Sequence, residues 1–176
     1  MRSLRHLLVA VLLLTLPLAA FARAPNAPPR FEPAPCPKLT GAEALARATC
    51  GYLVVPENRG QPSGRTLRLL VARYPARSAR KRPDPIVYLA GGPGDIAPLE
   101  ADGLIAAGFI ADRDILVMSQ RGTMFSRPAL TCPSIDDFAR AALGMRFYSE
   151  ATRRAHLAAT RACHRALAAT GADLAA

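Results

Sequence analysis

The sequence predicts an α/β protein in which a mostly parallel sheet carries an antiparallel hairpin at one edge. Two β-like runs separated by turn residues come first, and strand-like and helix-like segments alternate after residue 85. The run 86–90 is wholly apolar and leads directly into Gly-Gly-Pro-Gly, which is typical of a strand buried on both faces.

Residues 1–22 have the features of a secretion signal. Arg2 and Arg5 form a basic start, residues 7–18 are mainly apolar, and Ala20-Phe21-Ala22 is a small-x-small cleavage site. The apolar run is shorter than the roughly 20 residues of a spanning helix. We expect cleavage after Ala22, export to the periplasm or the medium, and no stable membrane anchor afterwards.

The chain is strongly basic, but its charge does not indicate a nucleic-acid partner. Its formal charge of +10 becomes about +8 once Arg2 and Arg5 leave with the signal. Nucleic-acid binding favours a basic stripe with interleaved aromatic residues. The densest basic cluster, residues 73–82, contains only Tyr74 and lies between two predicted strands, so we expect a solvated loop.

The four cysteines, an even number in an exported chain, predict two disulfides. Three pairings are possible, and the local one, Cys36 with Cys50 and Cys132 with Cys163, is the simplest. No Cys-x-x-Cys or Cys/His spacing indicates zinc, so we expect no metal and no cofactor.

After the signal, residues 23–49 are expected to form a Pro-rich lead-in and a short disulfide-stapled helix. Thr40 and Glu43 have the spacing of a capping box for a helix over 41–48. Residues 50–176 would form one incomplete domain, which opens with strands 51–56 and 66–74. The turn residues between these strands predict a hairpin.

The remaining segments alternate between strand and helix. Strand 85–90 is followed by a helix over 97–108 and a strand over 115–118. Ser134 and Asp137 predict a capped helix over 135–143. Ser149 can cap a last helix over 150–170, with Gly171 as its stop.

The turn 91–94 could bind phosphate, supply an oxyanion hole or simply reverse the chain. Its spacing matches neither phosphate-binding glycine motif, and Asp95 would repel an anion. Gly91 and Gly92 both have N–H groups that an oxyanion hole could use, whereas Pro93 has none.

Several motifs occur in a specific order: Cys-Gly-Tyr-Leu-Val-Val-Pro at 50–56, Tyr-Leu-Ala-Gly-Gly-Pro-Gly at 88–94, Gln-Arg-Gly-Thr at 120–123 with Ser126, then Cys132-Pro133 and Cys163. With them, residues 36–174 resemble the secreted α/β-hydrolases of the prolyl and tripeptidyl aminopeptidase (proline iminopeptidase-like) family.

The resemblance implies the amino-terminal half of an α/β-hydrolase fold. It implies Gly92 as a backbone oxyanion donor, with Gly91 as a second candidate. It also implies that Gln-Arg-Gly shapes the loop after its strand, and it supports the local cysteine pairing.

Three departures affect the active-site loops. Ser119 stands where the family usually has Asp, Met124 stands where it has Gly, and Asp95-Ile96 replaces small residues.

The catalytic triad of such an enzyme is absent from these residues. The nucleophile of the fold is the serine of Gly-x-Ser-x-Gly, which occurs nowhere in the sequence. His156 with Ser149 or Ser126 would be only an improvised dyad, and His164 reads as a surface helix residue. The missing nucleophile strand would leave 85–90 as an open edge.

The expected function is therefore that of an amino-terminal fragment of an exported serine hydrolase. The complete parent enzyme would cleave peptides from the amino end, and the fragment would be inactive alone. The alternative is a non-catalytic periplasmic binding or interaction protein on the same scaffold.

Overall fold

The computed structural model describes residues 28–92 and 94–175 of the chain. The predicted signal peptide, residues 1–22, and Pro93 of the glycine turn lie outside the described residues.

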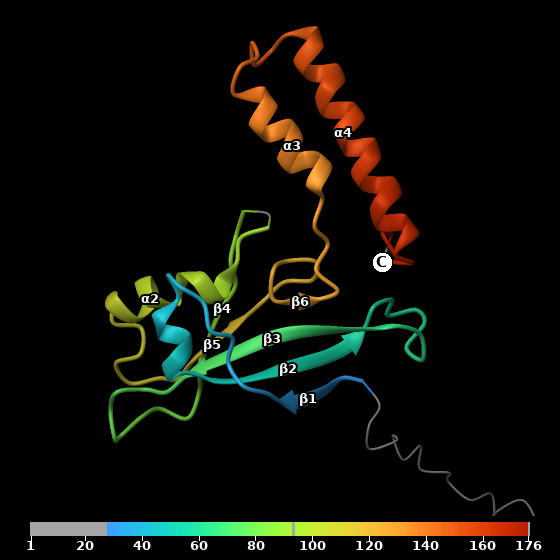
Figure 1. Cartoon of the computed structure of the whole chain (residues 1–176). Helices are drawn as coiled ribbons and strands as arrows, with labels where there is room; N and C mark the ends of the chain where they lie inside the picture. The colour runs from blue at the N-terminus through green and yellow to red at the C-terminus, as the bar shows by residue number, and fades with distance from the viewer. Residues whose placement is uncertain (1–27, 93, 176) are drawn as a thin grey trace, which may run out of the picture.

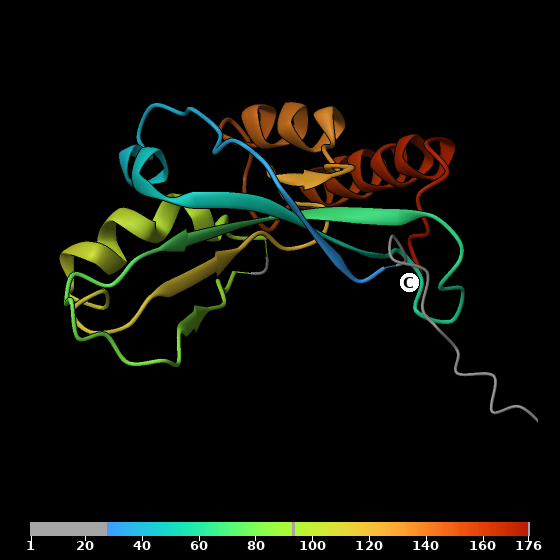
Figure 2. The same ribbon diagram turned by 90° about the horizontal axis from the view of Figure 1, so that it is seen from below.

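The described residues form a six-stranded sheet with the order β1-β2-β3-β5-β4, and a short β6 pairs beside β3. The strands are β1 (Arg30–Pro33), β2 (Thr49–Pro56), β3 (Thr66–Tyr74), β4 (Ile86–Tyr88), β5 (Ile115–Met118) and β6 (Ser126–Arg127). The helices are a 3₁₀ helix η1 (Glu43–Arg47), α2 (Ala97–Ala106), α3 (Pro133–Ala142) and α4 (Glu150–Ala169). Figures 1 and 2 show this arrangement from two directions.

The prediction of a mostly parallel, α/β-hydrolase-like sheet is wrong. The pairs β1–β2, β2–β3, β3–β5 and β3–β6 are antiparallel, and only β4–β5 is parallel. A parallel pair requires a crossover connection. Among the described elements, α2 makes the one crossover between paired strands, and every other strand joins the sheet in the antiparallel sense.

The prediction that strand 85–90 is buried on both faces is also wrong. In the described part of the sheet, β4 pairs with β5 alone and is therefore an edge strand. Ile86 and Tyr88 pack against the core, whereas Val87 is 55% exposed and Leu89 is 70% exposed. The apolar run is thus covered on one face only.

The main core lies between one face of the sheet and the two helical segments η1 and α2. Alternate residues of β3, namely Leu70, Ala72 and Tyr74, are buried on this face together with Ile115 and Val117 of β5. The small residues of α2 and η1 pack over them, as the cluster Ala42, Ala44, Ala97 and Ala101 shows. Because β4 and β5 both pack into this core, their ends are held in place.

The hairpin of β2 and β3, the helix α2 and the strand β5 confirm the sequence predictions for these segments. The predicted helix over 41–48 is instead a five-residue 3₁₀ helix, and Thr40 does not cap it. Glu43 still reaches backwards, because its Oε1 accepts a hydrogen bond of 3.0 Å from the Gly41 N–H. The Pro-rich lead-in contains β1, a strand that the sequence did not predict.

The helices α3 and α4 form a hairpin that stands away from the sheet (Figure 1). Ser149 caps α4 as predicted, since its Oγ accepts from the Thr152 N–H at 3.2 Å. Gly171 follows the helix with a φ of +77°, which favours glycine. The predicted cap at Ser134 is wrong, because its hydroxyl donates across to the Ala159 carbonyl of α4 at 3.0 Å.

Two disulfides join the described cysteines locally, Cys36 to Cys50 and Cys132 to Cys163. They fit a chain that folds in an oxidising environment. Within 28–92 and 94–175, none of the helices has both the length and the apolar character needed to span a bilayer.

Candidate functional site

The glycine turn lies at the carboxyl end of β4. Since β4 and β5 are parallel, with Tyr88 opposite Val117, their carboxyl ends meet at one edge of the sheet. The turn and the residues after β5 therefore form the candidate site.

Gly92 has a backbone conformation that only glycine adopts easily. Its φ is +119°, and an added Cβ would lie 2.9 Å from the Asp95 nitrogen. Gly91 and Gly92 are both exposed. Within the described part of the chain, neither of their N–H groups is used in a hydrogen bond. Two backbone donors are thus available to a ligand at this edge.

Gln120 holds the glycine turn from the neighbouring strand. Its Nε2 donates a 2.7 Å hydrogen bond to the carbonyl of Ala90, the residue just before the turn. The Thr123 hydroxyl in turn donates to the Gln120 carbonyl at 2.8 Å. The sequence pointed to a role for Gln-Arg-Gly in its own loop, but not to this contact with the turn. The missed signal was a polar side chain directly after a strand that is parallel to β4.

The electrostatic surroundings of the turn are acidic. Asp95 follows the turn and is exposed, and Glu100 of α2 accepts a hydrogen bond from the Tyr88 hydroxyl. This hydrogen bond raises the pKa of Tyr88, because it stabilises the protonated phenol beside a carboxylate. A permanently charged anion such as phosphate is disfavoured beside these carboxylates. A neutral carbonyl that gains charge only during a reaction suits the two backbone donors better.

Ser119 follows β5 but is not placed as a nucleophile. The residue is completely buried, its Oγ has no hydrogen-bond partner among the described residues, and its N–H donates to Leu70 at 2.8 Å. A substrate cannot reach this hydroxyl without a rearrangement of the sheet.

The serine and histidine pairs considered from the sequence are already engaged elsewhere. Ser126 is buried, and its Oγ contacts the carbonyls of Thr123 and Pro128 at 2.9 Å and 2.8 Å. The Ser149 hydroxyl caps α4. Nucleophilic activation needs a base within hydrogen-bond reach of the hydroxyl, and neither serine has one among the residues that the structure describes.

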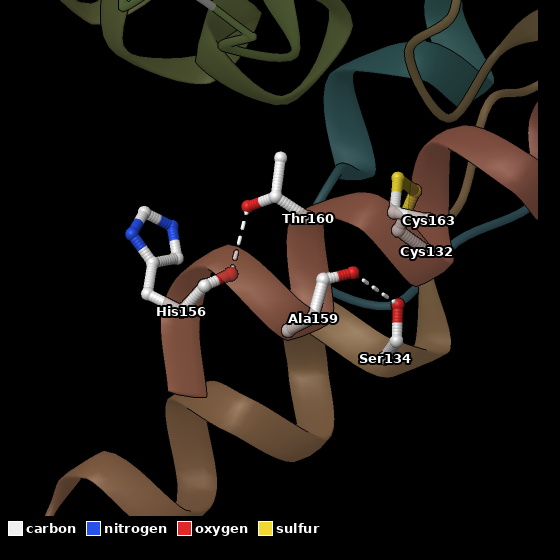
Figure 3. The surroundings of a disulfide bond; sticks show 6 residues. All are labelled: Cys132, Ser134, His156, Ala159, Thr160 and Cys163. Carbon is white, nitrogen blue, oxygen red and sulfur yellow. Dashed lines mark hydrogen bonds between the residues drawn. A yellow bond between two sulfur atoms is a disulfide. The ribbon is translucent and has the colours of Figure 1, made fainter. Parts of the chain in front are cut away.

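His156 lies on α4 and belongs to the packing of the helical hairpin. Its ring stacks on Phe138 with centroids 4.9 Å apart. Figure 3 shows the ring pointing away from the disulfide of Cys132 and Cys163. His164 is exposed beside Cys163 on the same helix. Across the described residues, no group of three or more acidic, histidine or cysteine side chains is arranged to hold a metal ion.

Comparisons with known proteins add no family. No protein-family model matches the chain. No curated protein matches it either. Among the described residues, the site offers two backbone donors on a braced turn and lacks an activated nucleophile.

Proposed function

We propose that this chain is the amino-terminal part of an exported serine hydrolase that cleaves peptides from their amino end. The observation that carries the proposal is the pair of free N–H groups on Gly91 and Gly92, at the carboxyl end of the parallel pair β4–β5. The motif order over residues 36–174 supports the reaction class by resemblance. The two disulfides support a periplasmic or secreted location.

The role of the turn in this proposal is electrostatic. When a nucleophile adds to a peptide carbonyl, the oxygen becomes negatively charged, and preorganised N–H groups stabilise that charge. Gly92 would be the principal donor and Gly91 the second. Gln120 keeps the turn in place through Ala90, so that the donors need not reorganise during the reaction.

The rest of the machinery is not in these 176 residues. A serine in Gly-x-Ser-x-Gly, its histidine and its acid would have to come from further protein. The outer edge of β4 is free in the described sheet, so a strand carrying the nucleophile can pair there. Without it, the purified chain is expected not to hydrolyse aminoacyl or peptidyl anilides.

Two measurements test the proposal. The first is the nucleotide sequence beyond codon 176, where a Gly-x-Ser-x-Gly motif, in frame or one frameshift away, is expected. A clear stop with nothing related beyond it would favour the non-catalytic binding protein. The second is anilide hydrolysis by the chain alone. Serine-dependent turnover that is lost in Ser119→Ala or Ser126→Ala would overturn the assignment of the site.

In the complete enzyme, Gly92→Ala tests the turn itself. The substitution strains a positive φ and places a Cβ against the Asp95 nitrogen, so the donors shift. Losing one oxyanion donor costs about 10²–10³ in kcat. Gly94→Ala is the matched control, because Gly94 also has a positive φ, +101°, but has open space for a Cβ. Equal losses in both variants would show that turn strain, and not donor position, controls the rate.

A further inference from the structure

A concave site lies at the opposite end of the sheet from the glycine turn. Tyr74 ends β3 and pairs with Ile115, the first residue of β5, so it marks the amino end of that strand. A cavity of about 310 Å³ opens beside it, close to η1 and α2. Its volume is at the lower end of the roughly 300–1,000 Å³ of small-molecule sites. The lining residues are Arg47, Tyr74, Pro75, Arg77, Ile105 and Ile110.

The walls of this cavity are held in place by the fold. The backbone N–H of Arg77 donates to the Ile110 carbonyl at 2.7 Å, and Ser78 donates to Ala111 at 3.0 Å. Ile105 and Ile110 are themselves buried, at 9% and 8% exposure. These two hydrogen bonds join the loop after β3 to the segment after α2, so the two walls of the cavity are tied to each other.

Arg47, Tyr74 and Arg77 contribute hydrogen-bond donors to the cavity, and the Asp102 carboxylate lies near Tyr74 and Arg47. Tyr74 is 2% exposed, yet its hydroxyl has no partner among the described residues. Burial raises the pKa of Tyr74 to about 12, with a smaller contribution from the nearby Asp102 carboxylate, so the hydroxyl remains protonated. A buried hydroxyl without a partner is destabilising, and a ligand that bonded it would relieve this cost. Because the Tyr74 oxygen is as inaccessible as that of Ser119, such a contact requires the side chains around the cavity to shift.

Two guanidinium groups add positive charge. Among the described residues, no carboxylate pairs with Arg77, although Arg73, Lys81 and Arg82 of the same region all have acidic partners. Arg47 has only Asp102, at 4.0 Å, which is the outer limit of an ion pair. Both arginines thus keep donors for an anion, while Ile105 and Ile110 offer an apolar surface.

We propose that this cavity binds a small organic carboxylate with a compact apolar body. The carboxylate would accept hydrogen bonds from Arg77 and Arg47, since guanidinium groups match carboxylate geometry. The apolar body would lie against Pro75, Ile105 and Ile110. An inorganic anion would leave this apolar surface uncovered, and a neutral ligand would leave the two cations unused.

Benzoate is a suitable probe, with acetate and benzyl alcohol as its matched analogues. Acetate keeps the charge without the ring, and benzyl alcohol keeps the ring without the charge. Binding to the full chain is measured by calorimetry and by the methyl NMR signals of Ile105 and Ile110. Benzoate is expected to bind more tightly than either analogue and to shift both methyl signals. Equal binding of benzoate and either analogue, or unshifted methyl signals, would overturn the proposal.

Two arginines of the same loop provide the variant and its control. Arg77→Gln is expected to weaken benzoate binding about tenfold, the value of one charge-assisted hydrogen bond. Arg80 is exposed and does not line the cavity, so Arg80→Gln is expected to change the affinity less than about twofold. Equal losses in the two variants would show general attraction to a basic loop and would overturn the site.

Tyr74→Phe isolates the buried hydroxyl. The ring still fills the core, and the variant loses no hydrogen bond within the described chain. Benzoate affinity is expected to fall about fivefold, as for one neutral hydrogen bond, while the midpoint of urea unfolding stays unchanged or rises. Unchanged benzoate affinity would show that the hydroxyl is outside the ligand's reach and would remove it from the proposed site.

Discussion

The sheet with η1 and α2 and the helical hairpin of α3 and α4 are stabilised by different means. In the sheet, Leu70, Ala72 and Val117 are completely removed from solvent. In the hairpin, α3 buries no residue and α4 buries only Thr152. The hairpin is instead held by the Cys132–Cys163 disulfide, the hydrogen bond from Ser134 to Ala159 and the stacking of Phe138 on His156. Burial thus dominates in one region and cross-linking in the other.

The largest expected effect is the loss of a buried side chain from the sheet. Leu70→Ala removes a fully buried leucine from β3 and should cost about 2–5 kcal/mol of unfolding free energy, measured by urea denaturation. Val87→Ala on β4 is the control, because Val87 is 55% exposed, and it should cost less than about 0.5 kcal/mol. Similar losses at both positions would contradict the assignment of the core to one face.

The second prediction concerns the disulfide of the helical hairpin and tests whether the hairpin and the sheet unfold separately. Replacing Cys132 and Cys163 by serine opens a loop of sequence separation 31, which the chain-entropy model values at roughly 3–4 kcal/mol. Because little else holds the hairpin, far-UV circular dichroism should show a loss of helix while the sheet still unfolds at its original urea midpoint.

The other disulfide is the control for this experiment. Replacing Cys36 and Cys50, of separation 14, should cost about 3 kcal/mol and should lower the midpoint of the sheet itself, because Cys50 is in its core. If both double variants lower the same transition equally, the two regions unfold as one unit and the comparison fails.

A smaller effect is expected at the start of α4. Ser149→Ala removes the hydroxyl that caps Thr152 and should destabilise the helix by about 1 kcal/mol. Thr160→Ala is the control, since Thr160 is exposed in the middle of the helix and its hydroxyl donates to the His156 carbonyl of the same helix, as Figure 3 shows. Helix content by circular dichroism should fall in the first variant and not in the second.

The smallest expected effect is a loss of stability at acid pH, and it is confined to the sheet. Hydrogen bonds from the Ala76 N–H and then from Lys81 and Arg73 hold the pKa of Asp114 well below its usual range. A lowered folded-state pKa stabilises the fold above the unfolded value of about 3.9, and this stabilisation is lost as the pH falls through the folded-state pKa. Asp114→Asn should therefore make the urea midpoint of the sheet less sensitive to acid. An unchanged pH dependence would count against a role for Asp114.

The sequence correctly predicted those elements whose ends are marked by turn or capping residues. The turn residues 57–64 between two apolar runs predicted the β2–β3 hairpin, and Ser149 and Gly171 marked both ends of α4. β1 was missed because Pro33 within it and the prolines just before it argue against a strand, although an edge strand tolerates proline.

Pairing partners could not be predicted in the same way. The position of β5 between β3 and β4 depends on contacts between segments far apart in the sequence, and no local pattern encodes it. The parallel sheet was inferred from the alternation of strands and helices, from the apolar run 86–90 and from the family resemblance. None of these fixes the direction of β3 relative to β5. At the site, the glycines could be located from the sequence, whereas the brace from Gln120 to Ala90 required the neighbouring strand.

The central position of β3 also has a consequence for how fast the chain folds. β2 and β3 are joined by a short linker, so their hairpin closes within a small loop. The next partner of β3 is β5, and the pair Tyr74 and Ile115 closes a loop of about 40 residues, which is entropically more costly. Contacts of large sequence separation slow folding. The rate-limiting step is therefore expected to be the docking of β5 onto a preformed β2–β3 hairpin, after which β4 can add at the edge.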